Sequence, residues 1–162
     1  MSMFLGIDPG LSGAMALLCS RRGLLDVTNL PVRDNGRGGT MRREIDSMAL
    51  RDTLSLWSRV HEMAMADVTA VIELPVAMRG ASTALSQGDT FGVVRTVAEF
   101  WSSRVVRVAP VDWKKRFGLT KQPKSASVAC ARRLYGQKLP KVLRNDLAEA
   151  ILIAHYGLME MA

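Results

Sequence analysis

The sequence predicts an α/β fold in which helices flank a five-stranded mixed sheet, the first three strands being antiparallel. Three short apolar segments follow one another with tight connections, and helical and strand-like segments then alternate. The expected strands span residues 3–8, 13–20, 24–30, 68–74 and 105–109. The expected helices span residues 46–66, 84–103, 124–135 and 145–159. Because the 162 residues contain no linker and no internal repeat, one domain over residues 1–162 is expected.

The first three strands should form a meander because short connections join them. Asp8-Pro9-Gly10 predicts a turn after the first strand, since Pro fixes φ and Gly permits a positive φ. Arg21-Arg22-Gly23 predicts a tight reversal between the second and third strands. Residues 31–44 hold four Gly or Pro and four Arg, which predicts a mobile loop.

The helices that follow have recognisable boundaries. Asp46 suits the N-cap of the first helix, and Leu50, Leu54 and Trp57 recur behind it at helical spacing. Pro110 should end the fifth strand. Gly136 lies just past the helix over residues 124–135, a common position for Gly at a helix end.

The composition favours a partner that is a polyanion. The net charge is +7 and the pI about 10.0, and residues 104–144 hold twelve Lys or Arg against one acid. A solvated basic surface is the alternative, but the charge spans several elements rather than one helix face. No apolar run reaches the roughly 18 residues of a membrane span, and no secretory signal is present, so a cytoplasmic location without a membrane partner is expected. The two cysteines cannot form a disulfide framework.

Four carboxylates stand at positions that suggest a common site. Asp8 ends the first strand and Glu73 lies at the end of the fourth, while Asp146 and Glu149 are three residues apart at the start of the last helix and so share a face. The first and fourth strands commonly lie side by side in such a sheet, which would bring Asp8 and Glu73 together. Each acid also has an ordinary interpretation: a turn residue, a salt-bridged strand end, or a helix-terminus acid favoured by the helix dipole.

Clustered carboxylates indicate a site for hard cations. At neutral pH some of the four would be protonated without a cation, because like charges repel. Oxygen ligands suit Mg²⁺ or Mn²⁺. Two such ions roughly 4 Å apart can activate water and stabilise the leaving oxygen in phosphodiester cleavage.

Three segments that carry these acids resemble motifs of a known family, the RuvC-type Holliday junction resolvases of the ribonuclease H-like superfamily. Residues 6–13, Gly-Ile-Asp-Pro-Gly-Leu-Ser-Gly, are similar to the family's first-strand motif, and Val71-Ile72-Glu73 is similar to its fourth-strand motif. Residues 145–154, in which two acids precede an Ala-rich apolar stretch, resemble the last-helix motif. The likeness covers nearly the whole chain in the same order. The Trp113-Lys114 pair and the compact length look closer to bacteriophage members.

The resemblance implies an endonuclease that cuts branched DNA such as a four-way junction with Mg²⁺ or Mn²⁺, two ions per site, in a bacterial cell or a phage-infected host. It implies that Asp8, Glu73, Asp146 and Glu149 are both catalytic and metal-binding. It also implies basic DNA contacts between the fifth strand and the last helix, at Lys114 or Lys115 and at Lys124. Further candidates for DNA contact are Arg79, Lys121, Lys141 and Arg144.

The resemblance further implies a homodimer in which each active site cuts one strand. Gly88 and Gly92 lie in the helix over residues 84–103, which forms the dimer interface in the family. Small residues at this spacing let another backbone approach closely, although internal packing against the sheet would explain them too. Trp113 is expected to be a packing residue, with base stacking as the alternative because Lys114 and Lys115 follow it.

The chain departs from the cellular members in three places. Glu149 stands where they usually carry Asp, and Val76 and Met78 stand where an aromatic residue often stacks on bases. The loop over residues 33–43 looks longer, and DNA contact is plausible for it. Two other functions stay open: an RNA-processing or flap nuclease on the same fold, and a non-catalytic binder of branched DNA. A binder would have no reason to keep four repelling acids.

Overall fold

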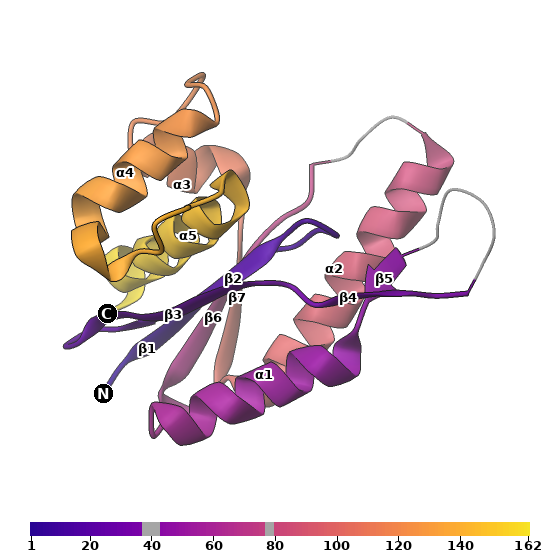
Figure 1. The fold of residues 1–162 in the computed structure, drawn as a ribbon, viewed down its shortest axis with the longest axis horizontal. Coiled ribbons are helices and arrows are strands. Elements are labelled where there is room, and N and C mark those ends of the chain that lie inside the picture. The colour runs from indigo at the N-terminus through magenta and orange to yellow at the C-terminus, as the bar shows by residue number, and fades with distance from the viewer. Residues whose placement is uncertain (37–42, 77–79) are drawn as a thin grey trace.

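The computed structural model describes residues 1–36, 43–76 and 80–162 and contains the predicted five-stranded sheet (Figure 1). The strand order is β3-β2-β1-β6-β7. β1 pairs with β2 and β2 with β3 in antiparallel fashion, whereas β6 runs parallel to β1 and β7 parallel to β6. The strands are β1 (Met3–Asp8), β2 (Ala14–Cys19), β3 (Gly23–Asn29), β6 (Val68–Glu73) and β7 (Arg104–Val108). The fold class and the expected neighbourhood of the first and fourth long strands are therefore confirmed.

Helices cover both faces of this sheet, as Figure 1 shows. They are α1 (Ser47–Val60), α2 (Ala81–Trp101), α3 (Pro110–Arg116), α4 (Ser125–Tyr135) and α5 (Asn145–Met161). Side chains of a strand alternate between the two faces, so Phe4 packs with α3, α4 and α5 while Leu5 packs with α1 and α2. The sheet is thus buried on both sides, which explains why β1 and β2 read as continuous apolar runs.

Close contact between α5 and β1 depends on small residues. A Cβ at Gly6 would overlap the Ala150 carbonyl oxygen and the Ala154 amide nitrogen of α5. A Cβ at Gly157 would overlap the side chain of Val71. Because neither position has a side chain, α5 lies directly on β1, which fixes the position of its amino-terminal turns above the sheet.

The predicted limits of two helices require correction. α1 ends at Val60 rather than near residue 66, because His61 caps it and Glu62 adopts a positive φ of 53°. A short 3₁₀ turn, η1 (Met65–Asp67), follows. α2 begins at Ala81, three residues before the expected start, and ends at Trp101 rather than at residue 103.

The interpretation of residues 31–44 as a loop was wrong at both ends. β4 (Val32–Asp34) and β5 (Arg43–Ile45) form a two-stranded hairpin, and the Arg33 guanidinium lies 2.8 Å from Glu44 Oε1 across it. The centre of the segment, residues 37–42, lies outside the described residues. Three residues on each side are too few for an alternating pattern to be visible in the sequence.

Two further short helices were not predicted. In α3, Pro110 occupies the first helical turn, where its missing N–H is not needed, so a residue interpreted as a strand end also begins a helix. The second is a 3₁₀ turn, η2 (Gly136–Lys138), directly after α4. Within the part of the chain that the structure describes, no helix combines the length and apolarity needed to cross a bilayer.

Candidate active site

Asp8 and Glu73 lie at the same edge of the sheet because their strands are parallel neighbours. The β1–β6 register pairs Ile7 with Ile72, so Asp8 and Glu73 are the next residues along each strand. Both are partly buried at the ends of otherwise buried strands. The sheet itself therefore brings together the first two of the four predicted acids.

Asp146 and Glu149 approach the same edge from above. They belong to the first turns of α5, whose contact with β1 at Gly6 fixes their position. Their side chains are 25% and 15% exposed, which is low for carboxylates in the opening turns of a helix.

The pKa of Asp8 shows that the four acids influence one another. Its pKa rises to about 7, first because of burial and then because of the charges of Glu73, Glu149 and Asp146. Burial also raises the pKa of Glu73, against the opposing effects of a hydrogen bond from Trp113 and the nearby charge of Lys114. This edge of the sheet is therefore a region of negative charge without full compensation by the chain.

Polar side chains of neighbouring elements contact three of the acids. Trp113 Nε1 in α3 donates to Glu73 Oε2 at 2.5 Å. Glu149 lies 3.8 Å from Lys114 Nζ, and the Ser127 hydroxyl donates to the same carboxylate at 3.4 Å. The remaining contact is local: the guanidinium of Arg144 lies 3.4 Å from Asp146 Oδ2.

The chemistry of this cluster fits a hard divalent cation. Among the described residues, no three His, Cys, Asp or Glu side chains form a ready-made metal cage, and the acids are held by Trp113, Lys114, Ser127 and Arg144 instead. All four predicted ligands are nevertheless carboxylates, the donors that Mg²⁺ and Mn²⁺ prefer. A cation would also relieve the repulsion that raises the pKa of Asp8. The four residues therefore fit such an ion by the chemistry of their donor atoms.

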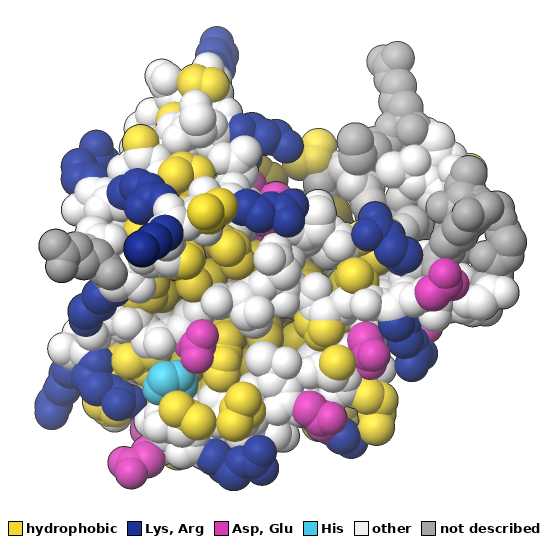
Figure 2. All heavy atoms as spheres, viewed as in Figure 1, with side chains coloured by type: hydrophobic (Ala, Val, Ile, Leu, Met, Phe, Trp, Pro, Cys, Tyr) yellow, Lys and Arg dark blue, Asp and Glu magenta, His cyan; other side chains and the backbone are white. Residues whose placement is uncertain are grey.

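The structure places the seven predicted DNA contacts in different surroundings. Lys114 faces the acids, with its ammonium 5.0 Å from the centre of the Trp113 ring. Arg144 is exposed beside Asp146. Four others are exposed on or around α3 and α4, namely Lys115, Lys121, Lys124 and Lys141. The last, Arg79, lies outside the described residues. Figure 2 shows basic side chains spread over this side of the molecule.

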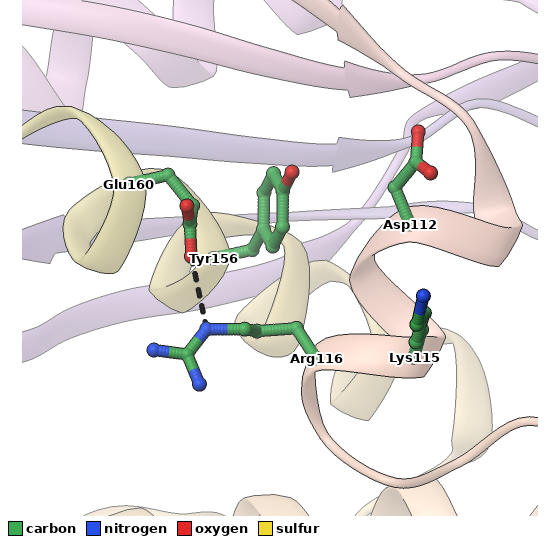
Figure 3. A pocket seen from close by; sticks show the side chains of 5 residues that line it. All are labelled: Asp112, Lys115, Arg116, Tyr156 and Glu160. Atoms are coloured by element: carbon green, nitrogen blue, oxygen red, sulfur yellow. Dashed lines mark hydrogen bonds and ion pairs between the residues drawn. The ribbon is translucent and has the colours of Figure 1, made fainter.

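Lys115 lines a separate hollow of about 410 Å³ between α3 and the carboxyl-terminal part of α5. Figure 3 shows it beside Asp112, Arg116, Tyr156 and Glu160. Arg116 Nε donates to Glu160 Oε1 at 2.9 Å, so that guanidinium is already engaged. The neighbours Lys114 and Lys115 therefore serve different surfaces, and only Lys114 touches the acid cluster.

The exposed face of α2 is open where the sequence places two glycines. Apart from the adjacent residues and the backbone of α2 itself, no described atom lies within 4 Å of a Cβ built at Gly88 or Gly92, so neither glycine is required for packing against the sheet. Both line a hollow of about 410 Å³ with Val93 and Val97. Val97 continues into a second, more apolar hollow that reaches Phe100, whose side chain is 74% exposed.

Trp113 contacts the candidate site in a way that the sequence did not reveal. It is a packing residue, as predicted, with 0% exposure, which removes base stacking as a role in this conformation. Its bond to Glu73 was not anticipated. The only signal was that a Trp directly precedes the Lys of a basic segment, a pattern that does not reveal where the indole N–H points. Val76 is 64% exposed, and Met78 lies outside the described residues.

The fold is similar to that of solved RuvC structures. A Thermus thermophilus RuvC structure has a TM-score of 0.63 and 18% sequence identity, over 94% of this chain and 90% of that chain. T. thermophilus RuvC in complex with a Holliday junction substrate has a TM-score of 0.68 and 19% identity, over 98% and 96%. The sequence matches no family model and no curated protein. The chain therefore has a ribonuclease H-like fold that is similar to the fold of RuvC.

Proposed function

We propose that this protein is a metal-dependent endonuclease that cuts branched DNA, with the four-way junction as its substrate. The observation that carries the proposal is that two acids at the ends of adjacent parallel strands, Asp8 and Glu73, lie near the two acids in the first turns of α5. The fold supports the proposal, since a similar structure holds a Holliday junction. The basic surface around α3 and α4 supplies the charge that DNA binding requires.

The four acids would hold Mg²⁺ or Mn²⁺, which supplies Lewis acidity and a lowered pKa for water in phosphodiester hydrolysis. Asp8 and Glu73 provide ligands from the rigid sheet, and Asp146 and Glu149 provide them from α5. Lys114 lies at the rim of the cluster, where its ammonium can contact a phosphate oxygen once Glu149 turns to an ion. Trp113 closes the cluster on its inner side, because its ring is fully buried.

Incubation with a labelled four-way junction tests this proposal. We expect cutting in Mg²⁺ or Mn²⁺ and none in chelator. Tight binding without cutting in either metal would instead favour a non-catalytic binder.

The salt dependence of DNA binding should locate the contact surface. Lys114, Lys115 and Lys124 replaced together by Ala should flatten the slope of log K against log[salt] by up to about three units, since each lost phosphate contact contributes about 0.9. The control replaces Arg21, Arg59 and Arg104, which are exposed and lie outside α3 and α4. Fluorescence anisotropy across a salt series measures both. An unchanged slope in the Lys variant would place the DNA elsewhere.

We further propose that the exposed face of α2 joins two copies of the chain. A four-way junction has two equivalent strands to cut, and a C2 dimer supplies two sites through one self-complementary surface. The open positions at Gly88 and Gly92 permit close approach of a second helix, and Phe100 adds exposed apolar area to the same face.

Replacing Gly88 and Gly92 with Leu should disrupt the dimer without unfolding the monomer. Within one chain the new side chains meet open space, and each removes a helical glycine that costs about 1 kcal/mol relative to Ala, so the monomer should not lose stability. Between two chains the added bulk should cost about 1–3 kcal/mol per site. Light scattering should show a monomer at micromolar concentration for this variant and a dimer for wild type. Gly88→Ala with Gly92→Ala is the control, expected to keep the dimer; a dimer unaffected by Leu would contradict the assignment of this face.

A further inference from the structure

Trp113 presents its only polar atom to one of the acids. We propose that Trp113 is a positioning residue, whose indole N–H fixes the orientation in which Glu73 binds a divalent cation. The inference rests on the proposed function, because it presumes that the acid cluster holds an ion. It adds a residue from α3 to a site otherwise made from the sheet and α5.

The geometry of this contact is specific. The two residues are 40 positions apart in sequence, and Nε1 lies 2.5 Å from Glu73 Oε2. The Trp113 side chain is 0% exposed, so water does not compete for its N–H. A buried indole needs some acceptor, and a carbonyl of the surrounding core would satisfy that need equally well. The acceptor is instead a carboxylate of the candidate site.

Short connections along the chain hold the indole and the carboxylate close together. Glu73 pairs with Val108 in the β6–β7 register, and the Leu74 amide donates to the Val108 carbonyl at 2.8 Å. α3 begins at Pro110, directly after β7, and Trp113 lies in the first turn of that helix. Glu73 is therefore the last residue of β6, and Trp113 follows the adjacent parallel strand β7 after a short connection.

An indole suits this role for chemical reasons. It donates one hydrogen bond, does not titrate and does not bind hard cations, so it cannot compete for the ion. Its bond engages Oε2 and leaves Oε1 outside that interaction. Hydrogen bonds of this kind to a ligating carboxylate hold its orientation, and their loss typically weakens metal affinity 10- to 100-fold.

The neighbouring residue extends the same arrangement. Lys114 Nζ lies 3.8 Å from Glu149 Oε1 and 5.0 Å from the centre of the Trp113 ring. Two consecutive residues of α3 thus contact two of the four acids. α3 supports both acids, with Trp113 as its buried contact and Lys114 as its partly exposed contact.

The test removes the N–H and keeps the ring. Site-specific incorporation of 3-benzothienylalanine at position 113 replaces the indole N–H with sulfur in a side chain of nearly the same shape. Mn²⁺ affinity is then measured by electron paramagnetic resonance without DNA, so the result does not depend on cleavage. We expect affinity 10- to 100-fold below that of wild type. The same analogue at Trp57, which is buried in the opposite core, should leave Mn²⁺ affinity unchanged.

Circular dichroism in chelator verifies that each variant is folded, and Trp113→Phe provides a second protein without the N–H. Wild-type Mn²⁺ affinity in the position-113 variants would overturn the inference and leave the indole a packing group. A wild-type protein without Mn²⁺ affinity would overturn the inference and the metal site together. If the position-113 variants bind Mn²⁺ more weakly and the wild-type protein cuts no DNA, the positioning role is supported. That result would contradict only the nuclease proposal.

Discussion

Asp8→Asn is expected to reduce cleavage of a four-way junction by more than about 100-fold, the scale on which a single lost electrostatic group acts on a transition state. The amide removes the charge that attracts a cation at the centre of the cluster, where Asp8 senses all three other acids. Binding of the junction should persist or become tighter, because a negative charge near the phosphates has been removed. Glu73→Gln, Asp146→Asn and Glu149→Gln should have the same effect. Single-turnover cleavage and anisotropy measure the two quantities separately.

Asp112→Asn is the matched control for this series. Asp112 belongs to α3 but lines the separate hollow shown in Figure 3, which none of the four acids lines. We expect cleavage by this variant at close to the wild-type rate. A normal rate in the Asp8 variant would remove Asp8 from the site.

The second large effect concerns stability in chelator. The pKa of Asp8 is about 7 in the folded chain against 3.8 for an unperturbed Asp, so between these values the folded state binds a proton that the unfolded state has lost. The free energy of unfolding must therefore fall as pH rises from about 4 to 7, by up to about 4 kcal/mol from this residue. Asp8→Asn should remove that contribution and unfold at higher denaturant concentration than wild type at pH 7.

Divalent cations should restore the free energy of unfolding that wild type loses as pH rises, and they should have no such effect on Asp8→Asn. An ion that binds only the folded state stabilises it, by about 2.7 kcal/mol at a concentration one hundred times its Kd. Urea unfolding at pH 4 and pH 7, with chelator and with Mn²⁺, measures each term. Parallel pH profiles for wild type and Asp8→Asn would mean that Asp8 is not held among uncompensated acids.

The sequence predicted the parts of the site that depend on strands. Runs such as Met3–Asp8 and Val68–Glu73 are long enough to recognise, and the acid at the end of each run is conspicuous among apolar neighbours. Once the two strands are parallel neighbours, the meeting of Asp8 and Glu73 follows from the geometry of the sheet. The position of Asp146 and Glu149 followed from their spacing in a helix, together with the family resemblance.

What the sequence did not predict depends on short elements and side-chain direction. α3 has seven residues, too few to show a period, and its first residue, Pro110, was interpreted only as the end of a strand. The hairpin of β4 and β5 has three residues on each side. The bond from Trp113 to Glu73 depends on where an indole points after folding, which no local pattern records.

We propose that two sites cut one branched DNA in a coordinated way, and a supercoiled plasmid that extrudes a cruciform distinguishes coordinated from independent cutting. A first nick releases the supercoiling and the cruciform is reabsorbed, so linear product forms only if both strands are cut while the protein remains bound. We predict linear plasmid in Mg²⁺ from wild type, nicked circles from the monomeric Gly88→Leu, Gly92→Leu protein, and intact plasmid from Asp8→Asn. Nicked circles alone from wild type, with equal cutting of flaps or RNA, would contradict the claim and favour a flap or RNA nuclease on the same fold.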